Sequence, residues 1–300
     1  MLEFKTEQKI VEIGKVKLGG QPGENPTVMI GTVFYAKHKA LLNEKTGEFD
    51  KKMLEQELND YTEVIEDTGM QGIIDVVGGY PEALAKQCEY ISDTVEYPFL
   101  VDGLNDKARI PAIEILSEKG LLEKAILNSI DDATSEENLL KLKDIGLNNA
   151  VLLTFSSRHI FPDQKLEFLK KKLIPKAKKA DIKNIIVDTA VLDLASIGVN
   201  VETVQLVKQE LGLPAGFAPA NAIYSWNYIK KFGDIPRCGA IASQMAYCVN
   251  AGSDFVLFGP IKFAKCAVPS IALINAINSY YRKRILRKPI SEKTPLKHIF

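Results

Sequence analysis

The fold is decided by residues 71–103, QGIIDVVGGYPEALAKQCEYISDTVEYPFLVDG. Two short apolar runs, IIDVV and FLVD, flank a helix-like segment, and Pro81 after Gly78 and Gly79 suits a first helical turn. Continuous apolar runs are typical of strands that are buried on both faces of a parallel sheet. The stretch therefore predicts a strand–helix–strand unit with parallel strands.

The same alternation continues along the chain. Apolar, β-rich runs recur eight times, with a helix-like segment between most of them. The expected strands are residues 27–34, 72–77, 98–102, 124–128, 149–155, 183–188, 214–219 and 254–258. Eight strands that alternate with helices predict a closed (β/α)8 TIM barrel, and an open doubly wound sheet is the alternative.

Several helices carry recognisable end signals. Gly69 and Gly212 are placed to end two of them, because glycine readily adopts the left-handed conformation that closes a helix. Thr134 with Glu137 predicts a capping box at the start of one helix. Asn200 is placed to cap the helix that Gly212 ends.

Two segments lie outside the repeat, within what we expect to be a single domain spanning residues 1–300. Residues 9–18, where Gly14 and Lys15 separate two short β-like runs, predict a β-hairpin that closes the N-terminal mouth of the barrel. This hairpin forms a cap at residues 1–26. The tail, residues 282–300, carries seven Lys or Arg and one Glu. It is expected to be a solvated end or to dock onto an acidic partner.

Composition narrows the classes of function. The 300 residues include 38 Lys plus Arg and 38 Asp plus Glu, so the net charge is zero and no nucleic-acid partner is expected. Four scattered cysteines without a CxxC pair do not suggest a disulfide framework, and a reducing, cytoplasmic setting fits best. The charged N-terminus and the lack of a long apolar run argue against export and against membrane insertion.

Polar residues gather where the expected strands end. In a barrel of this type the active site forms at the C-terminal ends of the strands. The residues at these positions are Asp75, Asp102, Asn128, Thr154, Asp188 and Asn221. Three acids at one mouth repel each other, so a ligand that donates hydrogen bonds, or a metal, is expected there. A flat heterocycle with several N–H donors, such as a reduced pterin, suits this set of carboxylates and amides.

The stretches IIDVVGG, FLVDG, AILNS and IIVDT at successive strand ends resemble the pterin-binding barrels. That group includes dihydropteroate synthase and the methyltetrahydrofolate:corrinoid methyltransferases. The opening, KIVEIGKVKLGGQPGENPTVMIGTVFYAKHK, is similar to the MtrH family of tetrahydromethanopterin S-methyltransferase subunits, and the similarity runs over nearly the whole chain. The resemblance implies a methyltransferase that exchanges a methyl group between the cobalt of a corrinoid, methylcobalamin or a corrinoid protein, and N5 of tetrahydrofolate or tetrahydromethanopterin. We expect tetrahydrofolate.

The resemblance also implies roles for individual residues. Asp102, Asn128 and Asp188 map onto the residues that hold the pterin in the family. Asn221 resembles the amide that faces N5, so Asn221 and the neighbouring carboxylate of Asp188 are the expected catalytic residues. Asp75 lies one strand earlier, where it contacts either the pterin or the partner. A corrinoid protein and a second copy of the chain are the expected partners.

Three other functions stay open on the same fold. The first is a non-catalytic subunit that docks a corrinoid protein and has no pterin affinity. A zinc-dependent thiol methyltransferase is the second, although no histidine accompanies the cysteines as a ligand set requires and no bound metal is expected. A Schiff-base aldolase is the third, but Lys124 and Lys183 lie at strand beginnings, the wrong end for catalysis.

Overall fold

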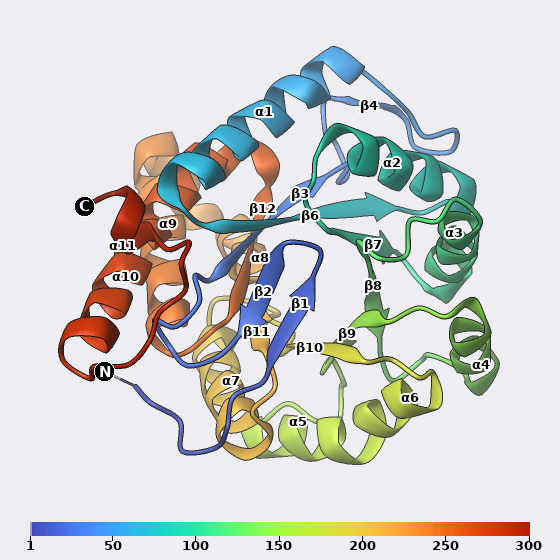
Figure 1. The fold of residues 1–300 in the computed structure, drawn as a ribbon. Coiled ribbons are helices and arrows are strands. Elements are labelled where there is room, and N and C mark those ends of the chain that lie inside the picture. Colours follow the sequence, from blue (N-terminus) through green and yellow to red (C-terminus); the bar gives the residue numbers. More distant parts are fainter. Residues whose placement is uncertain (1) are drawn as a thin grey trace.

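The centre of the molecule is a closed barrel of eight parallel strands (Figure 1). The computed structural model describes residues 2–300, except for the side chain of residue 230. The barrel strands are β3 (Val28–Val33), β6 (Gln71–Gly78), β7 (Phe99–Gly103), β8 (Ala125–Ile130), β9 (Asn149–Leu153), β10 (Asn184–Asp188), β11 (Ala215–Phe217) and β12 (Phe255–Pro260). Because β12 pairs with β3, the ring closes, which confirms the predicted barrel and excludes the open sheet.

Helices surround the strands and cover their outer face (Figure 1). They are α1 (Lys51–Thr68), α2 (Pro81–Thr94), α3 (Asp106–Glu118), α4 (Glu136–Ile145), α5 (Pro162–Phe168), the π-helix η1 (Leu169–Leu173), α6 (Ile174–Lys179), α7 (Ser196–Leu211), α8 (Pro219–Ser225), the 3-10 helix η2 (Asn227–Phe232), α9 (Asp234–Asn250), the 3-10 helix η3 (Ile261–Phe263), α10 (Ala264–Arg284) and α11 (Pro295–His298). A second hairpin, β4 (Leu41–Asn43) and β5 (Glu48–Phe49), precedes α1. Within residues 2–300, no helix combines the length and apolar character that a bilayer span requires.

The predicted N-terminal hairpin is present and closes one end of the barrel. Strands β1 (Ile10–Ile13) and β2 (Val16–Gly19) pair antiparallel around Gly14, which has a positive φ of 54°. The buried side chains of the hairpin pack against the innermost residues of the barrel strands, among them Val28, Ile73 and Leu100. Figure 1 shows the hairpin lying across the barrel opening. The carboxyl ends of the parallel strands lie at the opposite opening.

The end signals of the helices are only partly correct. Gly69 and Gly212 adopt left-handed conformations and end α1 and α7, as predicted. The cap of α4 is Ser135 rather than Thr134, because the Ser135 hydroxyl accepts the N–H of Asn138. Asn200 does not cap α7, because this helix begins a full turn earlier, at Ser196. Asn200 therefore lies within the helix, and its side chain is buried.

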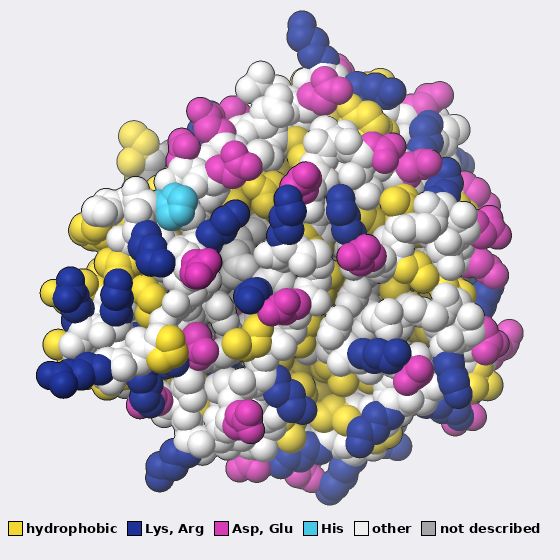
Figure 2. All heavy atoms as spheres, in the orientation of Figure 1, with side chains coloured by type: hydrophobic (Ala, Val, Ile, Leu, Met, Phe, Trp, Pro, Cys, Tyr) yellow, Lys and Arg dark blue, Asp and Glu magenta, His cyan; other side chains and the backbone are white. Residues whose placement is uncertain are grey.

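The basic tail is not simply a solvated end. The Arg282 side chain is buried and forms an ion pair with Glu24 at 3.1 Å, while its Nε donates to the carbonyl of Pro289. Thr294 is also buried, and its hydroxyl caps α11. Figure 2 shows other Lys and Arg side chains gathered on the surface over α10 and α11. The tail therefore packs on the barrel through Arg282 and leaves most of its charge outside.

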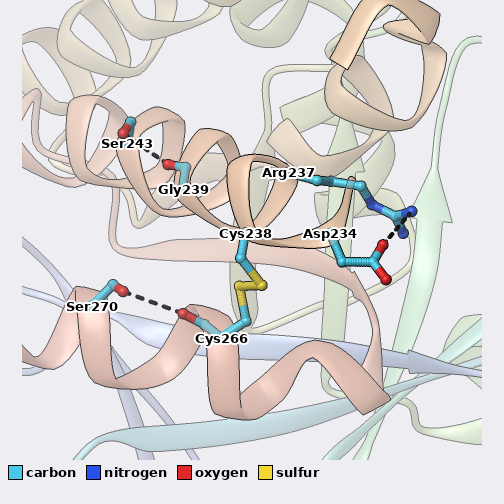
Figure 3. The surroundings of a disulfide bond; sticks show 7 residues. All are labelled: Asp234, Arg237, Cys238, Gly239, Ser243, Cys266 and Ser270. Carbon is cyan, nitrogen blue, oxygen red and sulfur yellow. Dashed lines mark hydrogen bonds and ion pairs between the residues drawn. A yellow bond between two sulfur atoms is a disulfide. The ribbon is translucent and has the colours of Figure 1, made fainter. Parts of the chain in front are cut away.

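The cysteines differ from expectation. Cys238 near the start of α9 and Cys266 near the start of α10 form a disulfide, with their Cα atoms 5.8 Å apart (Figure 3). Cys88 and Cys248 are free and buried. The sequence did not suggest this pair, because the two cysteines are 28 residues apart and meet only where α9 and α10 pack side by side.

The hairpin predicts a difference between two isoleucines of the same strand. Ile13 is 1 % exposed inside the barrel end, whereas Ile10 is 43 % exposed. We expect Ile13→Ala to lower the free energy of unfolding by about 2–5 kcal/mol, because it leaves a cavity in a closed core. The matched control Ile10→Ala is expected to change it by less than about 1 kcal/mol. Urea unfolding of both variants measures this, and equal losses would show that the hairpin is not part of the barrel core.

Candidate active site

The strand-end residues face the inside of the barrel. Ile73, Leu100, Ile126 and Ile186 are buried in the interior core together with the hairpin. Side chains alternate between the two faces of a strand, so residues two positions further along point to the same side. Those positions are Asp75, Asp102, Asn128 and Asp188 on β6, β7, β8 and β10. Four of the predicted site residues therefore converge on the barrel axis at its open end.

Depth in the barrel differs between these residues. Asp102 pairs in register with Asn128, and Val77 of β6 pairs with Asp102. Asp75 is thus two residues deeper than Asp102, and it is only 2 % exposed. Its Oδ2 accepts a hydrogen bond from the Thr32 hydroxyl at 2.8 Å, while its Oδ1 is buried without a partner among the described residues.

Burial changes the acidity of the carboxyl groups. Desolvation raises the pKa of Asp75 to about 7, the Thr32 hydrogen bond opposes this rise, and the charge of Asp188 adds to it. Desolvation likewise raises the pKa of Asp188 to about 6, opposed by the Ala190 N–H and by the Lys165 ammonium. The pKa of the half-buried Asp102 is also raised, first by desolvation and then by the charge of Asp75. The site therefore holds three desolvated acids, and one of them, Asp75, keeps an oxygen without a hydrogen-bond donor among the described residues.

A small hollow lies between two of these residues and the apolar floor of the barrel. It is lined by Asn128, Asp188, Ile30, Leu100, Val151, Ile186, Phe255 and Leu257. Such a mixture of an apolar surface with a few convergent polar groups is typical of sites for small organic ligands. The floor suits one face of a flat ring, and the polar groups suit its edge.

Two other predicted positions are placed differently. Thr154 is fully buried after β9, its N–H donates to the Asp188 carbonyl, and its hydroxyl has no hydrogen-bond partner within residues 2–300. Asn221 lies in the first turn of α8, directly after β11, and is exposed. No hydrogen bond links the Asn221 side chain to the acids among the described residues. Its catalytic role stays a prediction.

Two cations beside the acids were missed in the sequence. Arg109 on α3 is 6 % exposed, forms ion pairs with Asp106 and Asp131, and donates to the Asn128 carbonyl at 3.4 Å. Lys165 on α5 is equally buried and lies behind Asp188. The signal for Lys165 was available, because it occupies the same helical face as the buried residues Phe168 and Leu169.

Comparison with known proteins identifies the family. The family model described as the tetrahydromethanopterin S-methyltransferase MtrH subunit matches residues 6–290. The chain belongs to this family. The corresponding tetrahydromethanopterin S-methyltransferase subunit from Methanothermobacter thermautotrophicus is 33 % identical over 303 residues, covering 97 % of this chain and 98 % of the relative. The one from Methanocaldococcus jannaschii is 32 % identical, covering 97 % of each chain. This MtrH-family chain is accordingly a methyltransferase, as the resemblance predicted.

Solved structures support the same fold for the MtrH-family chain. Dihydropteroate synthase from Stenotrophomonas maltophilia superimposes with a TM-score of 0.60, at 15 % identity, over 90 % of this chain and 98 % of that one. The Xanthomonas albilineans enzyme with 4-aminobenzoic acid gives a TM-score of 0.58 at 14 % identity, over 91 % and 98 %. At this identity the likeness concerns the barrel alone.

Metal ligands are a separate question. Within residues 2–300, no group of three or more His, Cys, Asp or Glu side chains is placed to hold a metal ion. Cys238, Cys248 and Cys266 all lie on helices, and two of them are bonded to each other. His159 follows β9, where its Nδ1 lies 2.9 Å from the Ser156 hydroxyl and its ring stacks on Phe168.

The raised pKa of Asp75 predicts how stability depends on pH. The Asp75 carboxyl group binds a proton more tightly in the folded state than in the unfolded chain. Protonation of Asp75 therefore stabilises the fold at low pH, and this stabilisation is lost as pH rises from about 4 to about 7. We expect Asp75→Asn to be more stable than the parent at pH 8 by roughly 2–4 kcal/mol and nearly equal to it at pH 4.

Urea unfolding at a series of pH values measures this difference. The control is Asp60→Asn on α1, where the Lys265 ammonium lowers the pKa and no gain at pH 8 is expected. A stability difference between Asp75→Asn and the parent that does not change with pH would contradict the assigned ionisation.

Proposed function

We propose that this methyltransferase moves a methyl group between the cobalt of a corrinoid and N5 of a tetrahydropterin, which is bound by the inward-facing residues of the barrel. The observation that carries the proposal is the buried Asp75 Oδ1 without a partner among the described residues, beside two further acids with raised pKa values. Buried carboxyl oxygens require hydrogen-bond donors. A ligand rich in N–H groups would supply them.

The residues fit a pterin ring in two ways. One edge of the ring carries an amidine-like pair of donors that a carboxylate accepts in bidentate fashion. Asp102 and Asp188 on β7 and β10 would accept from the ring edge, together with the Asn128 amide, which lines the hollow beside Asp188. The apolar floor formed by residues such as Leu100 and Ile186 would lie against the ring face. Asp75 lies deepest and accepts the remaining donor.

The identity of the pterin is the finer part of the proposal. The similar proteins carry tetrahydromethanopterin in their names, whereas the sequence prediction favoured tetrahydrofolate. Both contain the same reduced ring, which is the part that the four inward-facing residues would contact. We therefore propose the ring as the recognised chemistry and test the two pterins separately.

The transfer step asks the chain for positioning and proton control. A corrinoid supplies a nucleophilic cobalt, so the protein needs to align donor and acceptor. N5 leaves more readily when it is protonated, and the Asn221 carbonyl with the Asp188 carboxylate would stabilise that charge. Asn221 is exposed in the first turn of α8, where a second substrate would reach it.

A corrinoid protein is the partner that this arrangement supports best. Several large apolar side chains in the segments that follow barrel strands at the open end are more than half exposed: Leu104, Ile160, Phe161, Leu192, and Tyr228 and Phe232 of η2. Exposed apolar groups around a mouth favour contact with another macromolecule. The homodimer predicted from the family stays a prediction.

The Schiff-base alternative gains one candidate that the sequence had not suggested. Lys165 is a buried amine whose pKa is lowered by desolvation to about 8. Its ammonium, however, donates to the carbonyls of Thr189 and Ala190 and to the Asn200 side chain. An amine with every N–H engaged is held away from attack on a carbonyl carbon, so the pterin proposal is preferred.

Substitution of the acids tests pterin binding. We expect Asp102→Asn and Asp188→Asn each to weaken tetrahydropterin binding about 10- to 100-fold, because each removes a charge-assisted acceptor. Anaerobic calorimetry with tetrahydrofolate and with tetrahydromethanopterin measures it. The control is Asp193→Asn in the loop after β10. Asp193 is exposed and its carboxylate accepts the Ser196 N–H, which an asparagine side chain accepts equally well. Unchanged affinity in both site variants would reject the pterin site.

Asn221 is expected to affect transfer more than binding. Asn221→Ala should leave pterin affinity within about twofold and slow methyl transfer roughly 10- to 100-fold, because only the charge on N5 loses a partner. The assay follows the corrinoid spectrum anaerobically, with methylcobalamin and either pterin. Pterin binding without transfer in the parent would indicate an obligatory corrinoid protein, and no binding of either pterin would favour the docking-subunit alternative.

A further inference from the structure

Lys165 is a buried cation that the proposed reaction does not yet use. Its side chain extends from α5, outside the ring of strands, and the residue is only 6 % exposed. The ammonium donates to the Thr189 carbonyl, to the Ala190 carbonyl at 3.3 Å and to Asn200 Oδ1 at 2.8 Å. Three N–H donors thus meet three acceptors from two separate elements, the turn after β10 and helix α7.

The turn that Lys165 holds is strained and lies against the site. Ala190 has a φ of +60°, a left-handed conformation that costs a residue with a Cβ about 1 kcal/mol or more. In this conformation the Ala190 N–H donates to Asp188 Oδ1 at 2.7 Å. The carbonyls that the ammonium binds belong to Thr189 and Ala190, so removal of the ammonium frees the turn to relax and to withdraw the N–H.

We infer that Lys165 is the positioning residue that fixes Asp188 in the barrel as an ionised pterin acceptor, acting through the Thr189–Ala190 turn and through its own charge. This inference rests on the pterin site proposed above, because it assigns a use to the ionised form of Asp188. Lys165 itself does not touch the ligand in this assignment. Its three bonds are all directed to the protein.

The charged groups around Asp188 predict the direction in which its pKa changes when Lys165 is replaced. The groups that face it are the acids Asp75 on β6 and Asp102 on β7 and the cation Lys165 on α5. Desolvation opposes ionisation of Asp188, whereas the Ala190 N–H and the Lys165 ammonium, which holds the turn that carries this N–H, favour it. A positive charge within about 4–6 Å typically lowers the pKa of a carboxyl by about 1–3 units.

The first experiment measures Asp188 directly, without pterin. The full-length protein is labelled with 13C at the aspartate carboxyl groups, and Asp188→Asn assigns the resonance. We expect Lys165→Met to raise the pKa of Asp188 by about one unit or more, because the side-chain length is kept while the charge and the donors are removed. An unchanged pKa of Asp188 would overturn the inference, whatever the ligand of the site.

The matched control is another lysine with the same kind of contacts. Lys176 Nζ donates to the carbonyls of Asp131, Asp132 and Thr134 at 2.7–2.8 Å, in the loop after β8. Lys176→Met therefore removes a carbonyl-bound ammonium without changing the turn beside Asp188. It should leave the pKa of Asp188 within about 0.3 units of the parent value. An equal shift in both variants would indicate a general loss of structure and would overturn the inference.

The second experiment follows tetrahydropterin affinity against pH. In the parent, affinity should fall below about pH 6 as Asp188 gains a proton, and above about pH 8 as Lys165 loses one. Lys165→Arg should abolish the alkaline fall, because a guanidinium does not titrate there. Asn200→Ala should move that fall to lower pH, because the ammonium loses one acceptor, and it serves if Lys165→Met does not fold.

The two proposals fail in different ways. If no tetrahydropterin binds to the parent while Lys165→Met still raises the pKa of Asp188, the pterin site is rejected and the positioning role stands for another ligand. If pterin binds but the alkaline fall is identical in the parent, Lys165→Arg and Asn200→Ala, Lys165 has no part in the site. Each result is obtained with the same purified chain and the same ligand, so the titration of the pterin itself cancels.

Discussion

The alternation of side chains along closed parallel strands is the constraint on which both ends of the molecule depend. In a closed barrel every strand has one face toward the axis, and that face is continuous from end to end. Near the strand beginnings it carries Ile73, Leu100 and Ile186, which the hairpin covers. Two residues later the same face carries acids. The apolar core and the candidate site are therefore successive layers of inward-facing side chains along the barrel axis.

The acid layer is costly for the fold. Carboxyl groups lose hydration at this depth, which is why the pKa values of Asp75 and Asp188 rise to about 7 and 6. Thr32 supplies one donor and the Ala190 N–H another, yet Asp75 Oδ1 lacks one among the described residues. Unpaired acceptors in a binding site commonly lower the stability of the fold. They also raise the affinity for a ligand whose donors pair with them.

Much of this could be predicted from sequence because strand patterns and strand ends are local. All eight strands, the hairpin and the four inward-facing residues follow from runs of apolar residues and the polar residue that ends each run. Apart from the cap of α4, which is Ser135 rather than its neighbour Thr134, the errors concern contacts between distant segments. Asn200 has the residue type of a cap, but its oxygen is used by Lys165, 35 residues earlier. Cys238 and Cys266 are likewise separated by a strand and meet only when helices α9 and α10 pack together.

The cations missed in the sequence explain how three acids can share one mouth. Lys165 and Arg109 both extend from helices outside the strands, and each donates to a backbone carbonyl at or just beyond a strand end. These cations therefore offset part of the negative charge of Asp102 and Asp188 from outside the barrel. A lysine or arginine inside the barrel would instead fill the hollow and donate to the acids itself. The interior keeps free acceptors on an apolar floor. Acidic acceptors on an apolar floor disfavour anions and favour a neutral ring with N–H donors, which is the chemistry that the proposed tetrahydropterin offers and a phosphate lacks.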